Sequence, residues 1–219
     1  MYKRQVLTLV FVTTLFSGCT SDEQSFTQKS YEADGTQVKE INIDVRDREI
    51  EVSVSEDSQL HIAYAESEKE YYDISVSEDS VLSMTAVENK EWSDYIGSKP
   101  KAENRKIVLQ IPDSLIAALK VSTTNADIEL SGLKVTEDLA LSSNGGNISF
   151  DKINAGRSIA LTGKNGDITG SILGGYDEYS IACKIKKGDS NLPAGKAGGS
   201  KTLSVNANNG DVEIEFCQS

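Results

Sequence analysis

The sequence predicts an all-β protein, a parallel β-solenoid whose coils are about 20–22 residues long. Three observations support this prediction. The second half of the chain repeats one unit five times. Within each unit, apolar and polar residues alternate as in a strand that buries one face. Each unit also contains a short turn rich in Asn, Gly and Asp, which joins two such strands.

The first residues predict a secretory signal peptide at 1–18. Lys3 and Arg4 precede eleven mostly apolar residues, Val6 to Phe16, too few to span a bilayer. The sequence LFSGC that follows resembles the lipobox of bacterial lipoproteins, which implies lipid attachment at Cys19. Phe16 stands where that motif prefers Leu, so an ordinary secretory signal with a chance cysteine is the alternative.

After Cys19, the stretch 19–38 is polar and lacks periodicity, and we expect it to be a flexible tether. The alternative is a first strand hidden in this stretch. A single domain is predicted over 39–219, with irregular early coils at 39–105 and regular repeats at 106–219. Alternating residues predict early strands at 40–45, 49–54, 60–64, 72–76, 81–86 and 106–112.

The regular units begin at an apolar residue that we expect to be buried. The five starting residues are Leu119, Leu139, Ile159, Ile181 and Leu203, separated by 20, 20, 22 and 22 residues. Two places on, a second inward residue follows: Val121, Leu141, Leu161, Cys183 and Val205. The sequence thus predicts five coils stacked in chain order.

Each turn precedes a second strand and a third inward place. Gly is the usual central residue because it reaches positive φ without a steric penalty. Inward pairs follow at Ile128/Leu130, Ile148/Phe150 and Val212/Ile214, and the third place holds Leu133, Ile153, Leu173 and Cys217. Asn-Gly also forms hairpins, so an antiparallel array is the alternative; the fixed period favours stacked coils.

The segment Ile107-Val108-Leu109-Gln110-Ile111-Pro112, followed by the repeated Asn-Gly-Asp units, resembles a widespread bacterial family. Its members are β-strand-repeat proteins of unknown function, commonly labelled putative adhesins and often lipoproteins. The resemblance covers about residues 39–216 and implies a right-handed parallel β-helix at the cell surface. It supplies no catalytic residues.

The turn acids Asp127, Asp167, Asp189 and Asp211 could stack into a calcium-binding ladder, because calcium prefers several carboxylate oxygens. Asn147 interrupts this column, and Asp in tight turns commonly accepts backbone N–H groups. Turn chemistry is therefore the favoured interpretation. No metal site and no cofactor are predicted.

Other chemically interesting residues also favour structural roles. His61 alternates with apolar neighbours and is expected to point outward from a strand. Lys184, Lys186 and Lys187 form a basic cluster that could touch anionic envelope polymer or lipid, although a solvated edge is the simpler interpretation. Cys183 and Cys217 are expected to point inward on different faces of neighbouring coils, as two buried thiols rather than a disulfide.

A net charge of −12 argues against nucleic-acid binding. No pair of acids stands out from the repeat, so no catalytic residue and no enzyme activity are predicted. We expect an exported protein, anchored by lipid in the cell or outer membrane and facing away from the cytoplasm. Its predicted role is a non-enzymatic, adhesin-like scaffold that binds an unidentified envelope polymer or protein. A regulatory partner in envelope-stress sensing is the alternative, and a polysaccharide-active enzyme comes third.

Overall fold

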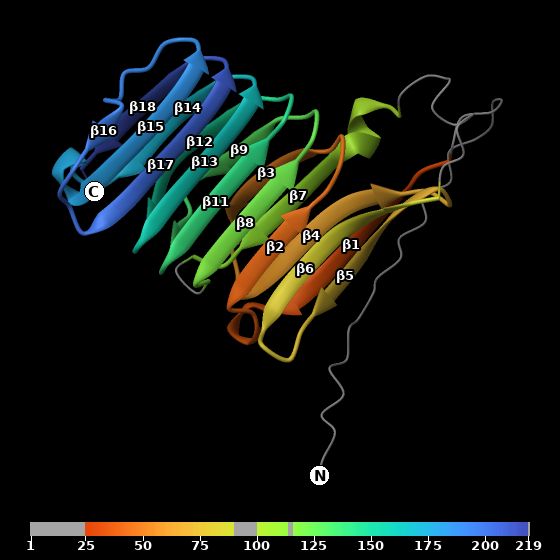
Figure 1. Cartoon of the computed structure of the whole chain (residues 1–219). Coiled ribbons are helices and arrows are strands. Elements are labelled where there is room, and N and C mark those ends of the chain that lie inside the picture. The colour runs from red at the N-terminus through yellow and green to blue at the C-terminus, as the bar shows by residue number, and fades with distance from the viewer. Residues whose placement is uncertain (1–24, 90–99, 114–115, 219) are drawn as a thin grey trace.

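The computed structural model describes residues 25–89, 100–113 and 116–218. Its strands form two nine-stranded sheets that lie face to face (Figure 1). The first sheet has the order β1-β4-β7-β3-β9-β12-β14-β18, with β10 paired to β12, and the second has the order β16-β15-β17-β13-β11-β8-β2-β6-β5. We call one passage of the chain through both sheets a coil.

The elements have the following bounds: β1 Thr27–Asp34, β2 Glu40–Asp44, β3 Glu49–Val54, β4 Gln59–Glu66, β5 Glu70–Val76, β6 Val81–Glu88, β7 Lys106–Ile111, β8 Ala118–Thr123, β9 Ile128–Ser131, β10 Lys134–Val135, β11 Asp138–Ser143, β12 Ile148–Ala155, β13 Ser158–Asn165, β14 Ile168–Leu173, β15 Tyr179–Lys187, β16 Gly195–Lys196, β17 Lys201–Asn209 and β18 Val212–Cys217. Three short 3-10 helices connect them: η1 Gly35–Gln37, η3 Ala102–Arg105 and η4 Tyr176–Glu178. All six early strands that the sequence predicts are present.

The middle of the molecule consists of three coils stacked in chain order: β8–β9, β11–β12 and β13–β14. Their strands pair in parallel, and like residues of the repeat lie side by side. In the second sheet Leu139 pairs with Leu119 on one side and with Ile159 on the other. The repeat interpretation is thus confirmed, and the antiparallel array is wrong for this region.

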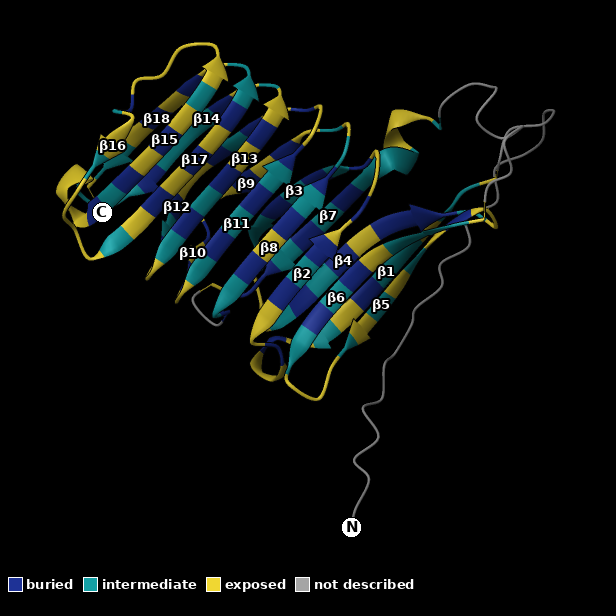
Figure 2. Ribbon diagram, viewed as in Figure 1, coloured by how far each residue is buried: buried dark blue, intermediate teal, exposed yellow. Residues whose placement is uncertain are grey.

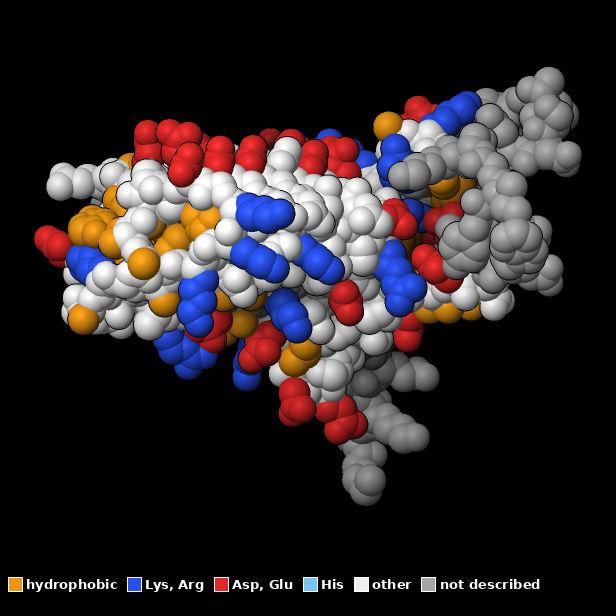
Figure 3. All heavy atoms as spheres, turned by 45° about the horizontal axis from the view of Figure 1, so that its top comes forward, with side chains coloured by type: hydrophobic (Ala, Val, Ile, Leu, Met, Phe, Trp, Pro, Cys, Tyr) orange, Lys and Arg blue, Asp and Glu red, His pale blue; other side chains and the backbone are white. Residues whose placement is uncertain are grey.

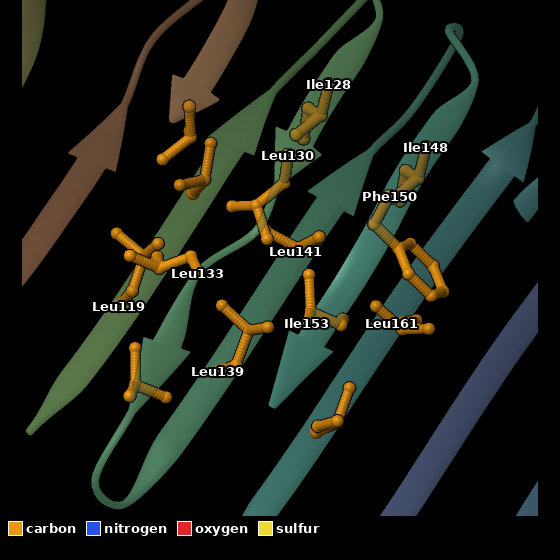
Figure 4. Close-up of a cluster of buried hydrophobic side chains, with 14 of the residues drawn as sticks. Leu119, Ile128, Leu130, Leu133, Leu139, Leu141, Ile148, Phe150, Ile153 and Leu161 are labelled. Carbon is orange, nitrogen blue, oxygen red and sulfur yellow. The ribbon is translucent and has the colours of Figure 1, made fainter. Parts of the chain in front are cut away.

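The space between the sheets is filled by the inward residues of the repeat (Figure 4). The five starting residues and their partners two places on are all buried, and so are the second inward pairs. Burial alternates along the strands (Figure 2). Two of the third inward places were predicted wrongly. A bulge after Phe150 shifts the register so that Ile172, rather than Leu173, pairs with Ile153 and is fully buried. In the last coil, Phe216 rather than Cys217 pairs with Ile172 and packs against the core.

The last two coils do not follow chain order. The coil β17–β18 lies between the coil β13–β14 and strand β15, so the predicted order is wrong here (Figure 1). Leu203 of β17 pairs with Ile159 on one side and with Ile181 on the other. Beyond β15, the short strand β16 runs antiparallel and covers part of its free edge.

The first coil is displaced in the same way. The coil β2–β3 lies between the coil β6–β7 and the coil β8–β9. Ile41 of β2 pairs with both Leu82 and Leu119, and Ile50 of β3 pairs with both Ile107 and Ile128. The sequence predicted that the segment 106–112 leads directly into the regular stack. In the structure, strand β7 is instead separated from the regular coils by the coil β2–β3.

The stack ends near β1, β4 and β5 in antiparallel strands. β4 runs antiparallel to β7, and β5 runs antiparallel to β6. The expectation that β4 and β5 belong to early coils is therefore wrong. β1 pairs along its whole length with β4. The prediction of a tether over 19–38 is thus wrong for Thr27–Asp34, because Tyr31 and neighbouring inward residues pack on the core.

A buried ion pair fastens this end. The guanidinium group of Arg48 donates to a carboxylate oxygen of Glu70, and both residues are almost fully buried. Arg48 Nε also donates to the hydroxyl of Tyr72 at 2.7 Å, and Tyr72 packs edge-on against Tyr64 at 5.4 Å between ring centroids. Burial raises the pKa of Tyr64 to about 12.

The predicted signal peptide and Cys19 lie outside the described residues. Among the residues that the structure does describe, no helix has the length and apolar character needed to cross a membrane.

Candidate functional site

The outer face of the first sheet carries rows of carboxylate and hydroxyl side chains. The strand register aligns one outward residue from each coil in the row Glu51, Glu129, Ser149, Thr169 and Glu213. Figure 3 shows acidic side chains gathered in a row along one long edge of the stack, with Lys and Arg side chains on the neighbouring face. Charge is therefore segregated around the stack.

A groove crosses this face over β3, β9, β12 and β14. Its volume is about 410 Å³. Its lining residues are Glu51, Val52, Glu129, Leu130, Ser131, Ser149, Phe150, Asp151, Thr169 and Gly170. The polar side chains among them belong to the outward rows, so the groove offers hydrogen-bonding groups from four neighbouring strands.

Two backbone irregularities shape one side of the groove. Gly170 has a φ of +156°, and a Cβ atom there would lie 2.0 Å from the carbonyl oxygen of Phe150. Beside it, the bulge in β12 places Lys152 at a φ of +50°. Ser171 holds this bulge, because its Oγ accepts the N–H of Lys152 and donates to Asp151 Oδ1, both at 2.8 Å. The carboxylate of Asp151 is thereby fixed at the groove.

The groove carries negative charge that is only partly balanced. Lys106 Nζ lies 2.7 Å from a carboxylate oxygen of Glu51 and 3.3 Å from one of Glu49. The hydrogen bond that Lys106 donates to Glu51 raises the pKa of Lys106. Within the described part of the chain, neither Glu129 nor Asp151 forms an ion pair with a Lys or Arg side chain. A ligand carrying amino or guanidinium groups would supply the missing positive charge.

The turn acids form a continuous column, as the turn interpretation predicts. Along the order Asp127, Asn147, Asp167, Asp211 and Asp189, each Oδ1 accepts the backbone N–H of the next residue at 2.7–2.9 Å. One oxygen of each side chain therefore holds neighbouring coils together. In the described ranges, no group of three His, Cys, Asp or Glu side chains is placed to hold a metal ion.

His61 and the lysine cluster lie away from the groove. His61 Nε2 is 3.0 Å from Asp57 Oδ1, and its Nδ1 is 3.5 Å from a carboxylate oxygen of Glu32. It thus links β4 to β1 and to the preceding turn, as expected of a structural residue. Lys184, Lys186 and Lys187 are all exposed on β15, in the second sheet.

Cys183 and Cys217 are free thiols, which confirms that they do not pair with each other. Cys183 is buried in β15, with its Sγ 3.6 Å from the hydroxyl of Ser190. Cys217 is only half-buried at the end of β18. The prediction of two buried thiols therefore holds for Cys183 alone.

Sequence reasoning did not find the groove. Its polar residues occupy outward places of the repeat, where Ser, Thr and Glu are ordinary surface residues. The available signal was their register, because Glu129, Ser149 and Thr169 occupy the same place in successive units. The bulge after Phe150, at one side of the groove, left no recognisable pattern in the sequence.

Comparison with known proteins identifies the family. The family model Toastrack DUF4097 matches residues 38–219. A search of curated protein sequences finds no match to this chain.

The solved structures that are similar to this chain have low sequence identity to it, and the first of them shares its fold. A putative cell adhesion protein from Clostridium sporogenes is 13% identical, with a TM-score of 0.61, and the match covers 90% of this chain and 100% of that one. Putative adhesins from Bacteroides fragilis and Parabacteroides distasonis are 13% and 14% identical, with TM-scores of 0.29 and 0.32. Each of these two matches covers 89% of this chain and 98% of the other.

Proposed function

The chain belongs to the Toastrack DUF4097 family, and we propose that it is a non-enzymatic, adhesin-like scaffold of the cell envelope. In this proposal, lipid on Cys19 anchors it to the cell or outer membrane, with the folded body outside the cytoplasm. The groove of the first sheet binds a basic segment of another envelope protein. We also propose that the coils wind in the right-handed sense, which is the usual sense of connections between parallel strands.

The observation that carries this proposal is the groove itself. It combines two acids that lack a basic partner among the described residues with three hydroxyl side chains, Ser131, Ser149 and Thr169. Lysine and arginine side chains can satisfy both kinds of group, since they carry positive charge and several N–H donors. Among the described residues, the exposed large aromatic side chains are Tyr71 and Tyr176, and both lie outside the groove. Phe150 lines the groove but is buried, so the lining presents no exposed ring on which a sugar could stack.

A rigid framework favours binding over catalysis. The groove residues lie on strands of a continuous sheet, and Asp151 is fixed by Ser171. A site that is already rigid presents its charged groups to a partner with little loss of conformational entropy on binding. The adhesin-like relatives support the same proposal, because their names describe attachment rather than a reaction.

A charge-matched pair of variants tests the groove. The groove variant carries Glu51→Gln, Glu129→Gln and Asp151→Asn, and the control variant carries Asp73→Asn, Glu78→Gln and Glu103→Gln at exposed sites outside the groove. Binding to a lysine-rich peptide and to detergent-solubilised envelope proteins is measured at low and high salt. We expect the groove variant to lose about tenfold in affinity, with the control close to the unmodified chain and salt weakening both. Equal losses in the two variants would contradict the proposal.

The anchor is tested separately. We expect the full chain to incorporate a radiolabelled fatty acid and to sediment with membranes. Cys19→Ala should abolish the label and release the protein into the soluble fraction, without changing groove binding. Labelling that persists in Cys19→Ala would place the lipid elsewhere.

A further inference from the structure

Four lysines gather at one edge of the second sheet, close to the turns that lead into the first sheet. Lys184, Lys186 and Lys187 lie on β15, and Lys164 lies on β13, with β17 between these two strands. All four side chains are exposed, and Lys184 and Lys186 alternate with the buried inward residues of β15, so they project from the outer face. Figure 3 shows Lys and Arg side chains gathered beside the acidic row. We call these four residues the lysine cluster.

The positive charge of the lysine cluster is not balanced inside the described structure. Lys201, at the other end of β17, lies 3.1 Å from a carboxylate oxygen of Glu178. By contrast, no member of the lysine cluster forms an ion pair with a described acidic residue. The neighbouring outward residue of β17 is Asn206, which pairs with Lys184 on one side and Thr162 on the other. A partner with carboxylate groups would therefore gain charge-assisted hydrogen bonds here.

The groove is the complement of the lysine cluster in charge and in spacing. Its acids Glu129 and Asp151 have no basic partner among the described residues. Glu129 pairs with Ser149, so Asp151 lies one strand across and two residues along from Glu129, a separation of about 8 Å between Cα atoms. Lys184 and Lys186 are two residues apart on one strand, which separates their Cα atoms by about 7 Å. Two ammonium groups of one copy can thus meet two carboxylates of another at the same time.

The groove and the lysine cluster of one chain cannot contact each other. The groove lies on the outer face of the first sheet and the lysine cluster on the outer face of the second, and these faces point in opposite directions (Figure 1). For the same reason, two copies cannot make both contacts with each other. Each chain would use its groove on one neighbour and its lysine cluster on another, which is a heterologous contact.

We propose that the lysine cluster is an interaction surface for a second copy of this chain, whose groove receives Lys184 and Lys186. This inference rests on the proposed function, because it names the basic segment that the groove binds. The two ammonium groups donate to the carboxylates of Glu129 and Asp151, and the amide of Asn206 lies beside them to bond with the hydroxyl groups of the groove. Repetition of the contact links copies of the scaffold head to tail.

Charge-matched variants of the full chain test this contact. All carry Cys19→Ala, so that no attached lipid contributes to association. The groove variant is the one described above. The lysine variant carries Lys184→Gln, Lys186→Gln and Lys187→Gln, and the control carries Lys39→Gln, Lys120→Gln and Lys134→Gln at exposed sites elsewhere. Sedimentation velocity measures association of each protein, and of mixtures, at about 0.02 M and about 0.5 M salt.

We expect the chain with Cys19→Ala alone and the control to associate at low salt, to grow beyond the dimer as protein concentration rises, and to dissociate at high salt. In the lysine variant and in the groove variant, the dissociation constant should rise about tenfold. An equimolar mixture of these two variants should associate as tightly as the chain with Cys19→Ala alone but stop at the dimer. The reason is that such a mixture supplies one intact groove and one intact lysine cluster to each pair.

Monomer alone at every concentration, or a lysine variant that associates like the control, would overturn the proposal. So would a mixture that associates no better than its two components. Loss of binding to vesicles of anionic phospholipid in the lysine variant, without any self-association of the parent chain, would assign the lysine cluster to a membrane instead. Binding of the lysine-rich peptide separates the two levels of the account. If the peptide binds the groove while the chain stays monomeric, this inference alone fails; if the peptide does not bind, the proposed function fails too.

Discussion

The middle of the stack and its two ends are built from the same kind of coil but assembled by different rules. In the middle, the coils β8–β9, β11–β12 and β13–β14 follow one another in chain order. At each end, the coil that comes first or last in the sequence does not lie at the end of the stack. The coil β2–β3 lies between β6–β7 and β8–β9, and the coil β17–β18 lies between β13–β14 and strand β15. Repetition therefore fixes what a coil looks like, whereas other features fix where it is placed.

The length of the connections is one such feature. Between β12 and β13, two residues, Gly156 and Arg157, are enough to carry the chain to the adjacent position. Between β14 and β15, the chain uses Gly174–Glu178, and β15 lies one coil further along. The longer connection spans the coil that is inserted later. The end near β5 also contains a buried ion pair, between Arg48 and Glu70.

Among these variants, Gly166→Ala should destabilise the structure most, at the boundary between the middle of the stack and its β17–β18 end. Gly166 has a φ of +141°, and the new Cβ atom would lie 2.4 Å from the carbonyl oxygen of Gly146. We expect a loss of about 4 kcal/mol in the free energy of unfolding, measured by denaturant titration, because a backbone clash and a disfavoured φ act together.

Gly195→Ala is the control for this variant, because a Cβ atom there would meet nothing within 4 Å. It should leave the unfolding midpoint nearly unchanged. Similar midpoints for the two alanine variants would show that close packing at the corners does not hold the coils together.

Arg48→Met should destabilise the end near β5 by about 3 kcal/mol, because it removes the buried guanidinium group that pairs with the carboxylate of Glu70. Adding Glu70→Leu should recover much of the loss, since the buried negative charge is then removed as well. Arg157→Met in the middle, where Arg157 pairs with Asp138 at the surface, should change stability little. Equal effects of the two arginine substitutions would contradict the difference between end and middle.

Tyr179→Phe should stabilise the opposite end by about 1 kcal/mol. Tyr179 is fully buried, and its hydroxyl finds no hydrogen-bond partner among the described residues. Burial raises the pKa of this hydroxyl to about 12. Thermal unfolding measures the effect, and a clear loss of stability in the phenylalanine variant would reveal a partner for the hydroxyl.

Asp138→Asn should give the smallest effect, visible mainly as pH dependence in the middle of the stack. The Arg157 side chain lowers the pKa of Asp138 from 3.8 to about 2. The folded state therefore binds this proton less readily than the unfolded chain, and the stabilisation present above about pH 4 is lost as the pH falls toward 2. Both groups are partly exposed, so about half a kcal/mol is expected at Asp138.

Measuring the free energy of unfolding between about pH 2 and pH 7 detects this contribution, because the carboxyl group of Asp138 changes charge within this range. Below about pH 4, the free energy of unfolding should fall less steeply in the asparagine variant than in the unmodified chain. Identical pH profiles would mean that Asp138 is not stabilised by Arg157 in solution.

The sequence predicted the composition of the coils because each inward place is filled by residues that must exclude water, such as Leu119, Leu139 and Ile159. It did not predict the order of the coils at the ends, because Ile181 and Leu203 are equally suited to the same inward position of the stack. The spacing offered a signal, since the last two units are 22 residues apart rather than 20. Strand β1 was only the alternative to a tether, because its inward residues, Lys29, Tyr31 and Ala33, include only one large apolar side chain.

Contacts between backbone protons test the central claim most directly. In a deuterated chain with protonated amides, nuclear Overhauser effects should join the amides around Ala160 to those around Ser204, and those around Ser204 to those around Ala182. The structure predicts no direct contacts between Ala160 and Ala182, because β17 separates their strands. Direct contacts between these two alanines, or the cross-strand pattern of antiparallel pairing between β11 and β13, would contradict the stack described above.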